Sequence, residues 1–297
     1  MNTTINKICY PCLTKQVYTI SDFAKLSKEQ TKRIAQVADE GLLRSRTTPM
    51  LPQHIARLVE DAVNRELGMP HDHDLYAELK QMSNDISLSY NGKFRQKIQE
   101  SNTPLETGMH IAAAGNIIDF GAKNHNSLNL EEELNSFDSV VFEHYDIRQF
   151  KDRLKSSKSL LYICDNCGEI VFDMLFIEEI QKEYPDLQIT AAVRDRPIIN
   201  DATLNDAAYI GLDTLVRVIS SGSIYPGTIL PETNELFQQE FSSADIIISK
   251  GQGNFETLSP IADARLFFLL RIKCSYMAGL SGVPEDSLVL MQGKGQC

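Results

Sequence analysis

The chain has 297 residues, a formal net charge of −11 and a hydrophobic fraction of 42%. This composition supports a substantial core, and no apolar run is long enough to span a membrane. The acidic balance argues against a nucleic-acid surface, and the N-terminus lacks the apolar stretch of a secretory signal, so we expect a cytoplasmic protein.

The first hundred residues carry helical periodicity. Residues 20–23 resemble a capped helix start, and Ser27 with Gln30 fits a capping box. Further helices are predicted over residues 52–67, 75–82 and 86–98 from apolar positions three and four residues apart. We therefore predict an all-helical N-terminal domain over residues 1–105.

After residue 105 the pattern becomes an alternation of strands and helices. Short apolar runs occur at residues 140–142, 160–163, 189–193, 215–219, 246–248, 266–272 and 288–291. Continuous apolar runs are typical of strands that are covered on both faces. Residues 106–297 are thus predicted to form an α/β domain, with a mostly parallel, Rossmann-like sheet and flanking helices.

Three of these runs end in polar side chains. Asp165 and Asn166 follow the second run, Asp201 follows the third after a short polar stretch, and Lys250 and Gly251 follow the fifth. In open α/β sheets, ligands bind in the crevice at the carboxyl ends of the strands. Carboxylate and amide oxygens suit a divalent cation, while a lysine and a glycine backbone suit phosphate. This pattern predicts a site for a cation and a phosphate group.

Each of these residues also has a structural interpretation. Asp165 and Asp201 could cap the helices that follow them. Glu169 could complement a helix dipole or, without binding the metal itself, orient a metal ligand or a water. Lys250 could be a solvated surface lysine. Local pattern alone leaves these alternatives open.

The six cysteines show no disulfide framework. Cys9 and Cys12 form a CxxC pair, for which a structural role and a redox or metal-binding role remain open. Cys164 and Cys167 have the same spacing, but about 150 residues separate the two pairs, which disfavours a shared zinc site. The run His71-Asp72-His73-Asp74 could bind a metal, although a solvated loop is favoured.

Several segments, in order along nearly the whole chain, resemble the damage-control phosphatase family, once known as domain of unknown function 89. They are Cys9-x-x-Cys12-Leu13, residues 114–121, Asp165-Asn166-x-Gly168-Glu169, residues 197–203 and residues 250–256. The CxxC pair is similar to the archaeal and bacterial branch. Two positions depart from the pattern: Cys167 stands where alanine is common, and Asp195-Arg196 stands where glycines are frequent.

This resemblance implies a metal-dependent phosphatase acting on phosphate monoesters of small metabolites such as sugar phosphates. It places one divalent cation, Mn²⁺, Mg²⁺, Co²⁺ or Ni²⁺, on Asp165, Asn166 and Asp201, with Lys250 as a further catalytic residue. The expected substrate-binding residues are Asn116, Asp119, Glu169, Arg194, Asn200, Ser221, Gly222, Lys250, Gly251, Gly253 and Asn254.

Two other functions remain open. One is an S-adenosylmethionine-dependent carboxyl methyltransferase, for which Gly168 alone would be a weak cofactor loop. The other is a protein that binds a phosphorylated metabolite without turnover. The expected partner is a small phosphorylated metabolite, with neither nucleic acid nor membrane, and the sequence indicates no oligomeric state.

Overall fold

The structure is a computed structural model that describes residues 5–115 and 141–294. The chain divides into two compact units. The first holds the residues up to Leu75 together with the loops 196–199 and 224–226, and the second holds the remainder. The units therefore divide after Leu75, whereas the sequence placed the boundary near residue 105.

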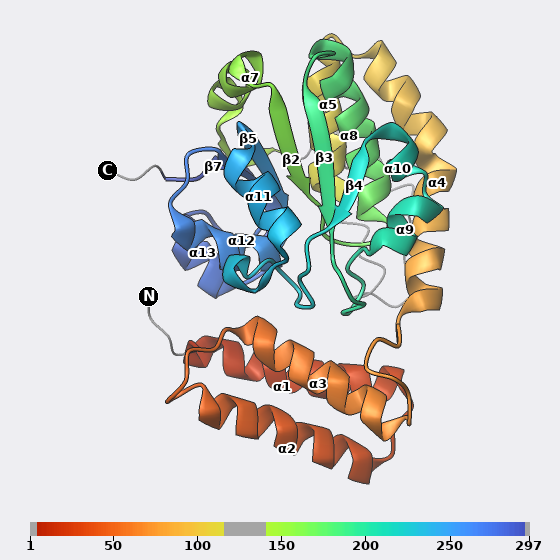
Figure 1. The fold of residues 1–297 in the computed structure, drawn as a ribbon, viewed down its shortest axis with the longest axis vertical. Helices are drawn as coiled ribbons and strands as arrows, with labels where there is room; N and C mark the ends of the chain where they lie inside the picture. The colour runs from red at the N-terminus through yellow and green to blue at the C-terminus, as the bar shows by residue number, and fades with distance from the viewer. Residues whose placement is uncertain (1–4, 116–140, 295–297) are drawn as a thin grey trace. The chain divides into compact units, whose positions relative to one another are not determined.

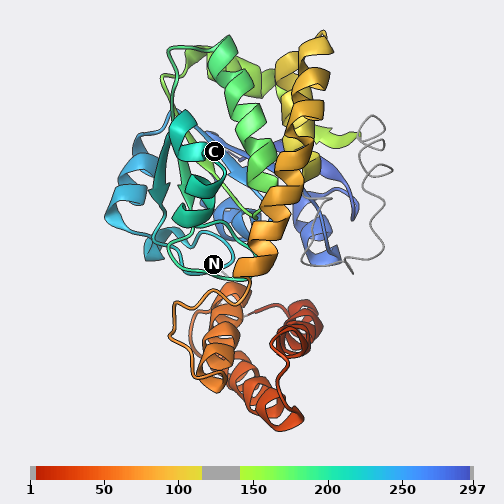
Figure 2. The same ribbon diagram turned by 90° about the vertical axis from the view of Figure 1, so that its right-hand side faces the viewer.

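The N-terminal unit consists of helices. After the short 3-10 turn η1 (Lys7–Cys9) come α1 (Tyr10–Phe23), α2 (Lys28–Arg44) and α3 (Pro52–Glu66), which pack against one another (Figures 1 and 2). The predicted capping box is confirmed, since Ser27 Oγ accepts from Gln30 N at 3.3 Å and Gln30 Oε1 accepts from Ser27 N at 2.9 Å. The predicted helix start at residues 20–23 is wrong. These residues form the last turn of α1, whose buried stripe begins at Leu13.

Two loops from later in the sequence belong to this unit. Glu60 Oε2 on α3 accepts a hydrogen bond from Ile199 N at 3.0 Å, and Arg57 Nη1 donates to Pro197 O at 2.8 Å. Ile199 has a φ of 47°, a conformation that is rare for a β-branched residue. The Glu60 bond thus supports a strained turn shortly before Asp201.

The second unit is built on a seven-stranded sheet in the order β1-β7-β6-β5-β2-β3-β4. The strands are β1 (Phe142–Tyr145), β2 (Ser159–Ile163), β3 (Gln188–Val193), β4 (Arg217–Ser220), β5 (Ile246–Lys250), β6 (Leu266–Arg271) and β7 (Leu288–Gln292). Every neighbouring pair is parallel except β6 with β7. The predicted mostly parallel α/β sheet is confirmed.

Helices cover both faces of this sheet (Figure 1). They are α4 (Ala77–Glu100), α5 (Pro104–Ala114), α7 (Ile147–Ser156), α8 (Glu169–Glu183), α9 (Leu204–Tyr209), α10 (Leu212–Leu215), α11 (Glu235–Ser243), α12 (Gln252–Leu258) and α13 (Ser275–Ser281), with the 3-10 turns η4 (Leu230–Glu232) and η5 (Ser259–Ile261). None of the helices in the described ranges combines the length and apolar character that a membrane span requires.

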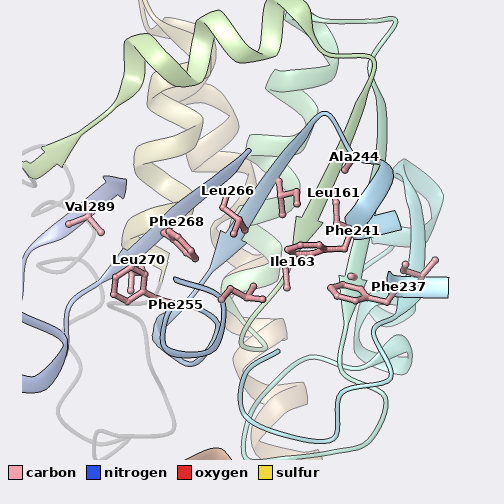
Figure 3. Close-up of a cluster of buried hydrophobic side chains, with 14 of the residues drawn as sticks. Leu161, Ile163, Phe237, Phe241, Ala244, Phe255, Leu266, Phe268, Leu270 and Val289 are labelled. Carbon is pink, nitrogen blue, oxygen red and sulfur yellow. The ribbon is translucent and has the colours of Figure 1, made fainter. Parts of the chain in front are cut away.

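The core follows the alternation of side chains along the strands. Leu161 and Ile163 of β2 point to the face covered by α11, α12 and α13, where Phe237 packs beside Phe241 and Phe255 packs edge to face on Phe268 of β6 (Figure 3). On the opposite face, side chains of β2 and β6 contact rings of α7 and α8. Truncating one such buried ring would cost about 3–5 kcal/mol.

Helix α4 is continuous, so the predicted break between residues 82 and 86 is wrong. Ser83 and Asn84 lie between the two predicted helices. In the structure both are buried, and Asn84 Oδ1 accepts a hydrogen bond of 2.6 Å from Gly168 N at the start of α8. Asn84 thus contacts the start of α8, while Ser83 Oγ donates to Leu79 O at 2.8 Å within α4, so neither side chain ends the helix.

Candidate active site

The carboxyl ends of three strands meet at one point of the sheet. Strand β2 lies between β5 and β3, and Ile163 pairs with Ala192 on one side and with Ser249 on the other. The chain moves outward from β2 to β3 and β4, and then returns to β5 on the opposite side of β2. Such a reversal of strand order opens the crevice in which α/β proteins bind ligands.

Backbone hydrogen bonds tie the two acidic segments of this crevice together. Ala202 N donates to Asp165 O at 2.8 Å, and Cys167 N donates to Asn200 O at 2.9 Å. Asn166 and Asp201 form an isolated β-bridge between these contacts. The loops after β2 and β3 therefore bring Asp165, Asn166 and Asp201 to one place, as the sequence predicted.

Neither aspartate caps a helix. Helix α8 begins after Gly168, which has a φ of 81°, and no side chain caps it. Helix α9 is capped by Thr203, whose N–H donates to Asp206 Oδ2 at 2.8 Å. The capping interpretation of Asp165 and Asp201 is wrong, which leaves both carboxylates for another role.

A buried arginine joins the two carboxylates. Arg194, with 1% of its surface exposed, donates from Nε to Asp201 Oδ2 at 2.6 Å and from Nη2 to Asp165 Oδ1 at 3.4 Å. Its third contact is Nη1 to Thr228 Oγ1 at 3.1 Å. All three contacts lie within the protein, so the geometry assigns Arg194 to the carboxylates, and its expected contact with substrate stays a prediction.

The carboxylates nevertheless remain in an unfavourable setting. Burial raises the pKa of Asp165 well above its usual value, and the neighbouring charge of Asp201 adds to the shift. Burial also raises the pKa of Asp201, although Arg194 opposes the rise. Both shifts mean that the charged forms lack sufficient compensation. A bound cation would supply it.

The net charge of the side chains that are hydrogen-bonded around this site also favours a bound cation. Within residues 5–115 and 141–294, the charged side chains joined by these hydrogen bonds are the four carboxylates Asp165, Glu169, Asp173 and Asp201 and the two cations Arg194 and Lys250. Four negative and two positive groups leave a formal charge of −2. This excess equals the charge of one divalent cation.

The oxygen atoms needed for such a cation are present. In the part of the chain that the structure describes, neither Asn166 Oδ1 nor Asp201 Oδ1 accepts a hydrogen bond from the protein. No three His, Cys, Asp or Glu side chains cluster as metal ligands within residues 5–115 and 141–294. Asp165, Asn166 and Asp201 instead offer two carboxylates and one amide oxygen, a combination of hard ligands that suits Mg²⁺ or Mn²⁺.

Glycine is required beside Asp165. Gly251, at the end of β5, has a φ of 78°, and a Cβ atom built on it would overlap the Asp165 carboxylate. Nearby, Asn254 Nδ2 donates to Cys164 O at 3.2 Å and to Lys250 O at 2.8 Å, while Asn254 Oδ1 accepts from Thr228. Asn254 thus joins the ends of β2 and β5 and is fully buried.

Lys250 is not a surface lysine, since none of its surface is exposed. Its ammonium donates to Ala112 O at 3.0 Å, Glu169 Oε1 at 2.5 Å and Asp173 Oδ1 at 2.6 Å. Burial opposes its charge, but Asp173 and Glu169 together raise the pKa of Lys250 above the usual value. These contacts use all three N–H groups of the ammonium, so a phosphate contact would require one of them to be released.

Several of the other predicted substrate-binding residues make structural contacts within loops and turns of the protein. Asn200 contributes its backbone carbonyl to the loop contact with Cys167. Ser221 is fully buried and Gly222 packs on the backbone of Asn234, so both shape the turn after β4. Gly253 O accepts from Thr257 Oγ1 at 3.0 Å. Asn116 and Asp119 lie outside the described residues.

Sequence reasoning missed Asp173, a buried partner of Lys250. Asp173 lies one turn after Glu169 on α8, and its Oδ1 also accepts from Tyr162 OH at 2.7 Å. The available signal was an acidic residue within residues 170–177 of α8, which are otherwise apolar. Cys164 is buried beside this group, and burial raises the pKa of its thiol, which agrees with its predicted role as a small apolar residue.

Comparisons with known proteins show which family the chain belongs to. A sequence profile described as the damage-control phosphatase ARMT1-like domain matches residues 5–289. The chain belongs to this family. Among its relatives, a damage-control phosphatase of Pyrococcus horikoshii is 32% identical over 286 residues, covering 96% of this chain and 97% of the relative. A damage-control phosphatase of Archaeoglobus fulgidus is 32% identical over 292 residues, covering 96% and 98%.

The fold is shared with a solved member of the damage-control phosphatase family. The crystal structure of a DUF89 family protein from P. horikoshii has a TM-score of 0.86 and 32% sequence identity, and the match covers 97% of this chain and 99% of that one. An uncharacterised protein of Methanocaldococcus jannaschii is 39% identical over 234 residues, covering 75% of this chain and 74% of the relative.

Proposed function

We propose that this protein is a divalent-metal-dependent phosphatase that hydrolyses phosphate monoesters of small metabolites. The observation that carries the proposal is the pair of buried carboxylates, Asp165 and Asp201, at the reversal point of the sheet, with a pKa raised in each. Membership of the damage-control phosphatase family supports the reaction class.

In this proposal Asp165, Asn166 and Asp201 hold one cation, Mn²⁺, Mg²⁺, Co²⁺ or Ni²⁺. When bound, such a cation would supply the positive charge that polarises a phosphoryl oxygen and helps to position the attacking water. Arg194 holds the two carboxylates in place through its contacts at 2.6 and 3.4 Å. Gly251 leaves room for the Asp165 side chain. Backbone N–H groups of the turn at Gly251–Gly253 are the proposed donors to the phosphate, because a glycine backbone permits close approach.

The substrate side of the proposal is a small phosphorylated metabolite, with sugar phosphates as the first class to test. Direct attack by water and attack by an aspartate remain two routes to the same products. A cytoplasmic location belongs to this proposal as well.

The proposal is tested with purified protein and a panel of sugar phosphates and nucleotides. Phosphate release should stop in excess chelator and return when Mn²⁺, Co²⁺, Ni²⁺ or Mg²⁺ is added. Full activity after chelation and dialysis would overturn the metal-dependent mechanism. Methyl transfer without any metal requirement would support the methyltransferase alternative, and tight phosphate binding without release would support the binding protein.

Single-residue variants test whether Asp165 and Asp201 are required for turnover. Asp165→Ala and Asp201→Ala should each reduce turnover by at least about a hundredfold, the effect of removing one electrostatic contact to a transition state. Asp213→Ala, at an exposed position of α10, provides the matched control for the loss of an aspartate. Circular dichroism on the same preparations verifies that each variant is folded. A folded Asp165→Ala variant with unchanged turnover would refute the assignment.

A further inference from the structure

A chain of buried hydrogen bonds leads from Lys250 to the proposed metal ligand Asn166. Lys250 Nζ donates to Glu169 Oε1 at 2.5 Å, and the other oxygen, Glu169 Oε2, faces Asn166 Nδ2 at 3.5 Å. Glu169 is 3% exposed and Lys250 is fully buried. The carboxylate of Glu169 is therefore held on one side by an ammonium and directed on the other side at an amide nitrogen.

The amide of Asn166 has a second acceptor on the same side. Asn166 Nδ2 also donates to Asp165 Oδ2 at 2.9 Å. With its nitrogen directed at two carboxylate oxygens, the amide must present its carbonyl oxygen in the opposite direction. Within the described residues that oxygen, Asn166 Oδ1, accepts no hydrogen bond.

The orientation matters because the two ends of an amide have nearly the same shape and opposite polarity. In the observed orientation a cation meets an oxygen ligand. In the flipped orientation a cation would meet two N–H donors, and Asn166 Oδ1 would face the negative oxygens of Asp165 and Glu169. The buried carboxylates thus favour one of the two orientations.

We propose that Lys250 and Glu169 are positioning residues for the cation site. Lys250 anchors Glu169, and Glu169 fixes the amide of Asn166 with its oxygen toward the cation. This inference rests on the proposed metal-dependent function, and it gives Lys250 a role other than the phosphate contact expected from the sequence.

The chain offers a matched control for Glu169. Asp173 is also a buried carboxylate on α8, it accepts from Lys250 Nζ at 2.6 Å, and its other protein contact is Tyr162 rather than Asn166. Glu169→Gln and Asp173→Asn each remove one negative charge from the group around Lys250. Only the first reverses the hydrogen-bonding polarity at Asn166, because Lys250 retains the oxygen of the new amide and the nitrogen of that amide then faces Asn166 Nδ2.

The experiment is isothermal titration of the wild type and both variants with Mn²⁺. Glu169→Gln should weaken Mn²⁺ binding at least tenfold more than Asp173→Asn does. Equal weakening in the two variants would overturn the proposal, because it would show an effect of charge alone. Adding Asn166→Asp to each variant supplies a second test. A carboxylate has an oxygen on both sides, so this change should restore Mn²⁺ affinity more in Glu169→Gln than in Asp173→Asn, and equal gains would contradict the positioning role.

Lys250→Met distinguishes the two roles of the lysine. As a positioning residue, Lys250 is needed for Mn²⁺ affinity, which should fall at least tenfold in a variant shown by circular dichroism to be folded. Unchanged Mn²⁺ affinity with weaker binding of inorganic phosphate would instead support the phosphate contact and overturn positioning by Lys250. If Lys250→Met does not fold, Glu169→Gln, which preserves shape, carries the test.

The same titrations separate this proposal from the proposed function. A wild type that binds no Mn²⁺, Mg²⁺, Co²⁺ or Ni²⁺ would refute both. Alternatively, the wild type could bind Mn²⁺ and hydrolyse phosphate esters while Glu169→Gln binds Mn²⁺ as tightly as Asp173→Asn does. That result would support the phosphatase and refute the positioning role.

Discussion

The carboxyl group of Asp173 should make the stability of the protein depend on pH in a defined direction. The side chain is fully buried on α8. Its Oδ1 accepts from Lys250 and Tyr162, while its Oδ2 has no hydrogen-bond partner among the described residues. Burial raises the pKa of Asp173 to about 6, even though Lys250 opposes the rise.

The sign and size of the effect follow from this shift. In the unfolded chain an aspartate has a pKa of about 3.9. The raised pKa in the folded state means that the contribution of Asp173 to stability is fully present below about pH 4 and is lost as the pH rises through about 6. A difference of about two pKa units corresponds to about 3 kcal/mol. Asp173→Asn cannot titrate and should not lose this amount.

The measured quantity is the difference in unfolding free energy between Asp173→Asn and the wild type, from urea titrations at about pH 4 and about pH 7. This difference should shift by about 2 kcal/mol in favour of the variant at the higher pH, because the unfolded aspartate is already about half ionised at pH 4, and any constant change in hydrogen bonding cancels. Because the chain contains no tryptophan, circular dichroism is the suitable signal, and Asp213→Asn controls for the loss of an exposed charge. A difference that is independent of pH would refute the reasoning, since it would mean that Lys250 fully offsets the burial of Asp173.

Three further outcomes are expected. Gly251→Ala should lower turnover and Mn²⁺ affinity at least about tenfold, because the new methyl group displaces Asp165 and because the φ of residue 251 is 78°. Gly279→Ala in α13, where a Cβ meets open space, should leave turnover and Mn²⁺ affinity within about twofold of the wild type. Equal losses in the two variants would contradict the steric argument. Ser27→Ala should reduce the stability of the N-terminal unit by about 1 kcal/mol through loss of the α2 cap, measured by thermal unfolding, and no change would show that Gln30 alone caps the helix. A Cys9→Ser, Cys12→Ser double variant should keep phosphatase activity when folded, and a folded variant without turnover would place the N-terminal pair in the mechanism.

Much of the fold could be predicted because apolar periodicity is a local signal. Runs such as Leu160–Ile163 are buried on both faces of the sheet, so their pattern needs no knowledge of distant residues. The break predicted within α4 is wrong because Asn84, whose polarity is typical of turns, accepts a hydrogen bond from Gly168, 84 residues further along the chain. Local pattern cannot reveal such a partner.

Local sequence could likewise predict some features of the candidate site but not others. Asp165, Asn166 and Asp201 could be predicted to meet, since parallel strands place their carboxyl ends at one edge of a sheet. The surroundings of Lys250 could not, because its partners Ala112 and Asp173 lie 138 and 77 residues away in the sequence. In the sequence, the charge of Lys250 and its position after an apolar run indicated a ligand contact. In the structure, its burial among carboxylates indicates that it holds another side chain in place.

The strand order also has a consequence during synthesis of the chain. Strand β2 ends at Ile163 and pairs with β3 soon afterwards, but its other neighbour, β5, begins only at Ile246. About 80 residues must be made in between, which takes roughly 4 to 16 s at common rates of translation. During that interval one edge of a mostly apolar strand has no partner on the nascent chain, and an unpaired edge of this kind favours association with other chains. We therefore expect the ribosome-bound chain to be most prone to aggregation, and most dependent on chaperones, between the synthesis of β2 and the synthesis of β5.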